Sequence, residues 1–136
     1  MVKIITGKKG SGKTKILIDM INESAKNTTG YVECIDKGTK LRYDIGHTVR
    51  LVDTDQYSIY SYDAFFGLVA GLVAGNYDIK DIYIDSILKI GGADYEALAA
   101  LLAKVDKLTG EDVNVVFTVS ADKSELPESV AKYAMN

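Results

Sequence analysis

The sequence predicts an α/β protein built as three layers, α/β/α, with helices on both faces of a mainly parallel sheet. Runs rich in β-branched residues alternate along the chain with segments whose apolar residues recur at helical spacing. No repeat, linker or run of like charge interrupts this alternation. The 136 residues suffice for one ordinary domain but not for two. We therefore expect a single domain over residues 1–136, with a sheet of about five strands.

The order of the elements follows from these runs. The expected strands are rich in β-branched and aromatic residues and lie at residues 1–6, 31–35, 48–53, 81–85 and 113–119. The expected helices have an apolar stripe and lie at residues 13–27, 61–75, 94–108 and a short segment that begins at Pro127. Asp36 to Thr39 has the composition of a tight turn, so a β-hairpin over Tyr31 to Ile45 is a candidate addition to the sheet.

The helix expected over residues 61–75 is apolar nearly all round and carries Gly67, Gly71 and Gly75 at four-residue steps. Three glycines inside a helix cost about 2 to 3 kcal/mol relative to alanine, which indicates a close approach to this face. We expect the glycine row to pack against the sheet of the same chain. A contact with a second protomer or a protein partner is the alternative.

One motif points to phosphate chemistry. The pattern G-x-x-x-x-G-K-[ST] is matched at every required position by Gly7-Lys8-Lys9-Gly10-Ser11-Gly12-Lys13-Thr14. The motif lies between a predicted strand and a predicted helix, where its glycines allow successive amides to surround phosphate oxygens. Lys13 would reach the β- and γ-phosphates as a catalytic charge, and the hydroxyl of Thr14 would bind Mg²⁺. The helix that begins near Lys13 adds the partial positive charge of its N-terminus.

With this motif the chain resembles the P-loop NTPase superfamily, strongly over residues 1–27 and by element order over the rest. Within that superfamily it is similar to small bacterial single-domain proteins loosely labelled as twitching-motility ATPases. Motility is not carried over, because 136 residues are too few for the second domain that such motors use. The resemblance implies ATP and Mg²⁺ as cofactors and a function of Mg-ATP binding with slow hydrolysis.

Asp85 is the expected acidic partner of Thr14 at the metal, because it ends an apolar strand as the Walker B aspartate does in the resembling family. The alternative is an aspartate that only caps the turn after the strand. In many ATPases of the superfamily a glutamate follows this aspartate and orients the attacking water. Here the next residue is Ser86, a departure that argues against fast hydrolysis.

Two other acids are candidate catalytic groups. In the RecA-like branch of the superfamily the water-orienting carboxylate ends the neighbouring strand, and Asp53 and Asp55 follow the strand expected at 48–53. Both are equally suited to a turn. At the end of the last strand, Thr118, Ser120 and Asp122 are candidates for sensing the γ-phosphate, because strand ends of open α/β sheets meet at the ligand edge.

The catalytic outcome is left open by the sequence. Arg42 and Arg50 are the only arginines and neither belongs to an arginine-rich lid, so no in-chain arginine finger is expected. The alternative function is a non-hydrolysing regulatory or adaptor module, in which a flexible segment at residues 86–93 changes order with ligand. A small-molecule kinase is a third function, although no lid is evident. No Asn-Lys-x-Asp motif is present, which favours ATP over GTP.

Composition excludes several other classes. The net charge of −3 provides no basic field for nucleic acid. The lone Cys34 and lone His47 cannot build a disulfide or a Cys/His metal framework, and they favour a reducing cytoplasm. Only two apolar residues follow Lys3 before Thr6, so we expect no secretory signal. The longest apolar stretch, residues 64–75, is too short for a membrane span.

Overall fold

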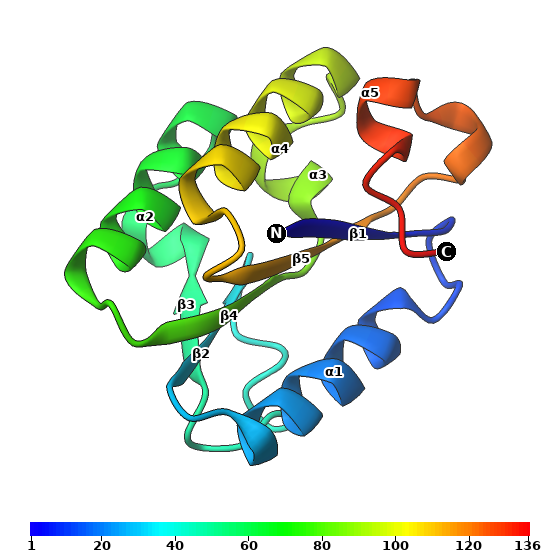
Figure 1. The fold of residues 1–136 in the computed structure, drawn as a ribbon. Coiled ribbons are helices and arrows are strands. Elements are labelled where there is room, and N and C mark those ends of the chain that lie inside the picture. Colours follow the sequence, from blue (N-terminus) through cyan, green and yellow to red (C-terminus); the bar gives the residue numbers. More distant parts are fainter.

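The computed structural model describes residues 1–136 as an α/β fold with a five-stranded, all-parallel sheet (Figure 1). The strands are β1 (Val2–Thr6), β2 (Tyr31–Asp36), β3 (Arg50–Asp53), β4 (Ile79–Ile84) and β5 (Asn114–Val119). The helices are α1 (Lys13–Asn27), α2 (Tyr62–Gly75), α3 (Ile87–Gly91), α4 (Tyr95–Thr109) and α5 (Glu128–Ala131), with short 3₁₀ turns η1 (Thr54–Tyr57) and η2 (Lys123–Glu125). The three-layer prediction is confirmed.

Each face of the sheet has its own hydrophobic core. On one face α1 packs Leu17 and Ile21 into a cluster that includes Ile5 and Cys34 of the strands. The larger cluster lies on the other face, which α2 and α4 cover (Figure 1). At its centre the rings of Phe65 and Phe117 meet edge to face at 6.0 Å. Burial of the strands from both sides explains why they are rich in apolar residues without a strict alternation.

The strand order is β1-β5-β4-β2-β3. The last strand of the sequence, β5, therefore lies between the first strand and β4, with Ile4 opposite Phe117 and Ile84 opposite Phe117 on its two sides. All neighbouring pairs are parallel, so the carboxyl ends of the strands meet at one edge of the sheet. This edge collects the residues that follow β1, β2, β4 and β5.

The hairpin predicted over Tyr31 to Ile45 is wrong. β2 ends at Asp36, and residues 37–49 form successive turns before β3 adds to the sheet parallel to β2. The run at residues 41–45 has a single buried residue, Leu41, which packs on the α1 side of the sheet. Because its other side chains stay largely exposed, a returning strand would have buried little apolar surface.

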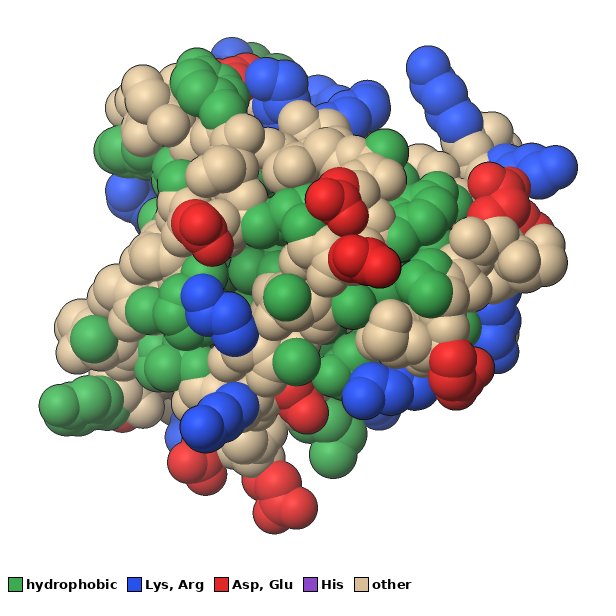
Figure 2. All heavy atoms as spheres, turned by 90° about the horizontal axis from the view of Figure 1, so that it is seen from above, with side chains coloured by type: hydrophobic (Ala, Val, Ile, Leu, Met, Phe, Trp, Pro, Cys, Tyr) green, Lys and Arg blue, Asp and Glu red, His purple; other side chains and the backbone are tan.

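The expected packing of the glycine row against the sheet is also wrong. α2 buries Tyr62, Phe65 and Val69, whereas a side chain added at Gly67, Gly71 or Gly75 would meet nothing within 4 Å. The large apolar residues of α2 therefore occupy the sheet-facing stripe, and the glycines face outward. Figure 2 views the molecule from the side of α2 and α4, where hydrophobic side chains are interspersed with acidic and basic ones. No helix of the chain is both long and apolar enough to cross a membrane.

The segment predicted to be flexible, residues 86–93, contains the short helix α3. Ile87 and Ile90 lie one turn apart and are buried in the larger core. Tyr62 of α2 packs against Gly91 and donates a hydrogen bond from its hydroxyl to the carbonyl of Gly92. Gly91 thus provides room for the ring of Tyr62, whereas Gly92 has a φ of 99°, which side chains other than glycine rarely adopt.

Candidate functional site

The phosphate loop, defined here as Gly7–Thr14, connects β1 to α1 at the carboxyl edge of the sheet. Gly10 and Gly12 have φ angles of 85° and 93°, which side chains other than glycine rarely adopt. The loop is anchored at its start by a hydrogen bond of 3.0 Å from the amide of Gly7 to the carbonyl of Ala121. The local sequence therefore dictates this backbone path.

Unpaired amides converge on this loop. The N–H groups of Gly10, Gly12, Lys13 and Thr14 donate to no other backbone group of the chain. α1 begins directly after Gly12, and no side chain caps its first turn. Free amides at the start of a helix form an anion site, because their partial positive charges point the same way.

Lys13 lies across the loop. Its side-chain amine donates hydrogen bonds to the carbonyl of Lys8 at 2.9 Å and to the hydroxyl of Ser11 at 3.4 Å. The residue is only 7% exposed, and burial lowers the pKa of this amine although the charge of Asp85 opposes that shift. An anion brought into the loop would stabilise the charged form of Lys13.

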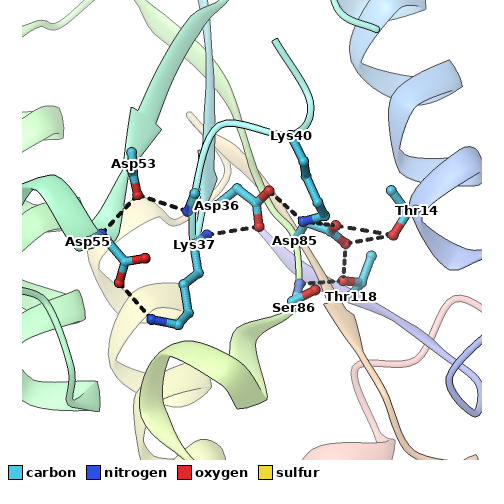
Figure 3. A network of polar contacts seen from close by, with 10 residues as sticks. Thr14, Asp36, Lys37, Lys40, Asp53, Asp55, Asp85, Ser86 and Thr118 are labelled. Atoms are coloured by element: carbon cyan, nitrogen blue, oxygen red, sulfur yellow. Dashed lines mark hydrogen bonds and ion pairs between the residues drawn. The ribbon is translucent and has the colours of Figure 1, made fainter. Parts of the chain in front are cut away.

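The side chains of Thr14 and Asp85 are in contact, as the sequence predicts, although β5 lies between the strands β1 and β4 that precede them. The Thr14 hydroxyl lies 3.1 Å from Oδ2 and 3.3 Å from Oδ1 of Asp85, which follows β4 and has no solvent exposure (Figure 3). The hydroxyl of Thr118 in β5 donates a hydrogen bond of 2.6 Å to Oδ1 of Asp85 and accepts one of 2.7 Å from the amide of Ser86. The carboxylate is thereby fixed with its oxygens toward the phosphate loop.

Of the three residues predicted as phosphate sensors, Thr118 is the one that joins this network. It is almost fully buried, at 1% exposure, and touches Asp85 directly. Ser120 lines the cavity described below. Asp122 instead caps η2, where hydrogen bonds from the hydroxyl and amide of Ser124 lower its pKa.

Sequence reasoning missed Asp36 and Lys40. The neighbour of β4 is β2, so the residue that ends β2, Asp36, lies beside Asp85 at the same edge. Asp36 has no solvent exposure, and its Oδ2 accepts a hydrogen bond of 2.6 Å from the ammonium of Lys40. The same ammonium lies 3.4 Å from Oδ2 of Asp85 (Figure 3). The signal was present, because β2 and β4 both end in an isoleucine followed by aspartate.

The charges of these groups influence one another. Burial raises the pKa of Asp36, although the hydrogen bond and charge of Lys40 oppose that shift. Burial disfavours the charged form of Lys40, but the hydrogen bond to Asp36 and the charges of Asp36 and Asp85 outweigh it and raise its pKa. The ammonium of Lys40 thus compensates two acids that have no solvent exposure.

Asp53 and Asp55 do not end the strand next to β4. Asp53 is the last residue of β3, the outermost strand, and Asp55 lies in η1 directly after it. β2 lies between β3 and β4. Oδ1 of Asp53 accepts the amides of Gly38 at 2.8 Å and Asp55 at 2.9 Å, while the carboxylate of Asp55 pairs with Lys37 at 2.6 Å (Figure 3). Both acids therefore hold the turn after β2 and η1, and their expected position beside Asp85 is wrong.

A cavity of about 440 Å³ opens between these groups. Four lysines and a single carboxylate contribute to its lining, namely Lys9, Lys13, Lys40, Lys89 and Asp85. No arginine lines it, since Arg42 contacts Tyr43 and Arg50 begins β3. The excess of positive charge suits a polyanion.

The donor set is that of a hard cation. Thr14 and Asp85 offer oxygen atoms only, and no group of three or more His, Cys, Asp or Glu side chains elsewhere could hold a metal ion. Mg²⁺ is commonly held by one or two protein oxygens, with water and substrate phosphate completing its shell. The residues present therefore fit Mg²⁺ bound together with a phosphate ligand.

No protein-family model and no curated protein matches the sequence. The interpretation of the site therefore depends on its own geometry and chemistry.

Proposed function

We propose that this chain is a P-loop protein that binds Mg-ATP in the 440 Å³ cavity and hydrolyses it slowly. The observation that carries the proposal is the convergence of four lysines and a row of unpaired loop amides on one cavity, beside the Thr14–Asp85 pair. A triphosphate needs dispersed positive charge and many hydrogen-bond donors, and this cavity has both.

Each residue has a defined part in binding. The unpaired amides of the loop donate to the phosphate oxygens, namely those of Gly10, Gly12, Lys13 and Thr14. The ammonium of Lys13 leaves its contacts with Lys8 and Ser11 to contact the β- and γ-phosphates. Thr14 and Asp85 hold Mg²⁺, which when bound neutralises the charge on the terminal phosphates. Thr118 keeps Asp85 oriented through its 2.6 Å hydrogen bond.

Slow hydrolysis follows from the groups available. Asp36 is the carboxylate beside Asp85. It is enclosed and paired with Lys40, so it orients the attacking water only after bound phosphate draws that ammonium away and opens Asp36 to the cavity. Lys40 is the cation nearest to both acids, and it takes the place that an arginine finger has in faster enzymes. An arginine finger contributes about 10³- to 10⁵-fold in rate, and no arginine lines this cavity. A partner or second protomer that supplies one would accelerate the reaction.

ATP is the proposed nucleotide because the chain lacks the Asn-Lys-x-Asp sequence that reads guanine. The proposed location is the cytoplasm, where the buried free thiol of Cys34 stays reduced. The net charge of −3 makes a nucleic-acid partner an unfavourable choice.

The experiment is a calorimetric titration with Mg-ATP and Mg-GTP, run beside a phosphate-release assay on the same sample. Binding of Mg-ATP with release above the Lys13→Ala background supports the full proposal. Absence of binding for both nucleotides contradicts it.

A non-hydrolysing regulatory module is the second candidate. It is favoured by Ser86, which stands directly after Asp85, and by Lys40, whose ammonium lies against both Asp36 and Asp85. In this case Mg-ATP binds with the same affinity and no phosphate is released. The same titration and assay separate the two functions.

A further inference from the structure

A second and larger cavity, of about 700 Å³, lies on the β3 edge of the sheet beneath α2. It shares no lining residue with the cavity at the phosphate loop. Its walls are partly apolar, with Leu68 and Leu72 of α2 and Val52 of β3, and also include the polar side chains of His47 and Asn76. A volume in this range is typical of sites for small organic ligands.

Glu33 of β2 lines this cavity as a carboxyl group without a partner. The residue is 7% exposed, and its Oε2 is enclosed and accepts no hydrogen bond. No ion pair of the chain includes it. Burial raises the pKa of Glu33, although the charge of Arg50 opposes that shift. An unpaired buried carboxyl is costly, and native structures seldom keep one without a reason.

No side chain of the fold donates to Oε2 of Glu33, although His47 and Asn76 line the same cavity. The register neighbours of Glu33 are Ile82 on β4 and Arg50 on β3. The side chain of Ile82 has no polar group, and the exposed side chain of Arg50 forms no ion pair with the carboxyl. Above Glu33, α2 contributes leucines to the cavity. A hydrogen bond to Oε2 is therefore left for water or for a ligand that enters the cavity.

We propose that this cavity is a binding site for a small organic cation, with an apolar or aromatic body and an amine, amidine or guanidinium group that donates to Glu33. The apolar walls receive the body of the ligand. Tyr31 and Tyr57 line the cavity with 56% and 51% exposure, and their rings suit a neighbouring cation or a flat ligand. This site does not depend on nucleotide binding.

Arg50 sets a limit on the ligand. It lines the same cavity and carries a positive charge directly across from Glu33 in the strand register. Its charge repels a cationic ligand, and because the side chain is exposed the repulsion is weakened by solvent and salt. Removal of this charge should therefore tighten binding, an effect opposite to that of removing the charge of Glu33.

The test is a titration of the ¹⁵N-labelled chain by NMR with benzamidine, a flat amidinium, and with benzamide, its neutral counterpart. Benzamidine should shift amides of β2, β3 and α2 saturably, and bind about tenfold more tightly than benzamide. In Glu33→Gln this preference should fall to within about twofold, and Arg50→Gln should tighten benzamidine binding by about two- to threefold. The exposed Glu111→Gln is the matched control and should behave like the natural chain.

Equal affinity for the charged and neutral probes would overturn the proposal. So would shifts confined to other parts of the chain, or the absence of binding by both benzamidine and cyclohexylmethylamine. Should Glu33→Gln fail to fold, the comparison of the two probes on the natural chain and on Arg50→Gln still decides the question.

Discussion

The ammonium group of Lys40 lies 2.6 Å from the carboxylate of Asp36, four residues earlier in the chain. Asp36 has no solvent exposure, and neither has Asp85, which lies 3.4 Å from the same ammonium. A single lysine from the turn after β2 therefore balances two enclosed acids at the carboxyl edge of the sheet.

Loss of this lysine should destabilise the fold. Removing one partner of a buried pair costs about 3 to 5 kcal/mol, but the side chain of Lys40 is 49% exposed, so we expect Lys40→Met to lower the free energy of unfolding by only about 1 to 2 kcal/mol. Urea unfolding measures this. The double variant Lys40→Met, Asp36→Asn should regain most of the lost free energy of unfolding. Lys37→Met, which removes the exposed pair with Asp55, should change the free energy of unfolding by no more than about 0.5 kcal/mol. A double variant as unstable as Lys40→Met would contradict the assignment.

Lys13→Ala should lower the affinity for Mg-ATP by about 100-fold, because the variant loses a charge-assisted contact with the phosphates. Calorimetry or a fluorescent ATP analogue measures the change. Lys15→Ala is the matched control, since Lys15 is exposed and pairs with Asp19 on the outer face of α1. Tight binding by Lys13→Ala would exclude the phosphate loop as the nucleotide site.

Asp85→Asn should remove most of the dependence of nucleotide affinity on Mg²⁺, because the amide keeps the shape of the side chain but loses the charge that holds the ion. We expect the natural chain to bind ATP at least about tenfold more weakly after removal of Mg²⁺ with EDTA. The ATP affinity of the variant should be nearly the same with and without Mg²⁺. Asp81→Asn, in the first half of β4 and away from the phosphate loop, is the control. An unchanged Mg²⁺ dependence in Asp85→Asn would show that the metal is held elsewhere.

Phosphate release should distinguish the acid beside Asp85 from those after β3. Asp36→Asn is expected to lower the rate at saturating Mg-ATP by about 100-fold, the usual scale for losing a group that orients or deprotonates water. Asp53→Asn should have a small effect, because its amide oxygen can still accept from Gly38. A large loss of rate in Asp53→Asn with little loss in Asp36→Asn would assign the water-orienting role to Asp53 instead.

The stability of the chain should depend on the protonation of Glu33. Its pKa in the folded state is raised above the ordinary value of 4.5, chiefly by burial. Its contribution to stability is thus greatest below that value and is lost as the pH rises through the folded-state pKa. Glu33→Gln should therefore be more stable than the natural chain at neutral pH, by about 1 kcal/mol, and not at acidic pH. Urea unfolding of both chains across this range, with Glu111→Gln as control, provides the measurement.

Local patterns predicted the parallel strands, the three long helices and the glycine-rich path between β1 and α1, but they missed α3 and placed a hairpin where turns lie. The loop motif depends on neighbouring residues, and its glycines have the positive φ angles that the pattern requires. Thr14 and Asp85 were paired from the same reasoning, because one begins a helix and the other ends an apolar strand. These features depend on chemistry that is visible within a few residues.

The order of strands could not be read in this way. Asp36 and Asp53 both end apolar strands, and only the position of β2 next to β4 decides which of them lies beside Asp85. The orientation of α2 was equally hidden, because a helix that is apolar nearly all round does not reveal which side it buries. Phe65 and Val69 fill the core, and the larger side chains thus exclude the glycines from it.

The insertion of β5 between β1 and β4 has a consequence for how the chain folds. Until β5 has been synthesised, β1 has no strand beside it on the side of β4, and Asp85 lacks the hydroxyl of Thr118. Thr14 and Asp85 are 71 positions apart, so their contact must wait for long-range closure of the sheet. The phosphate loop and its acid should therefore come together late, and a ribosome-bound chain that ends before β5 should have no assembled nucleotide site.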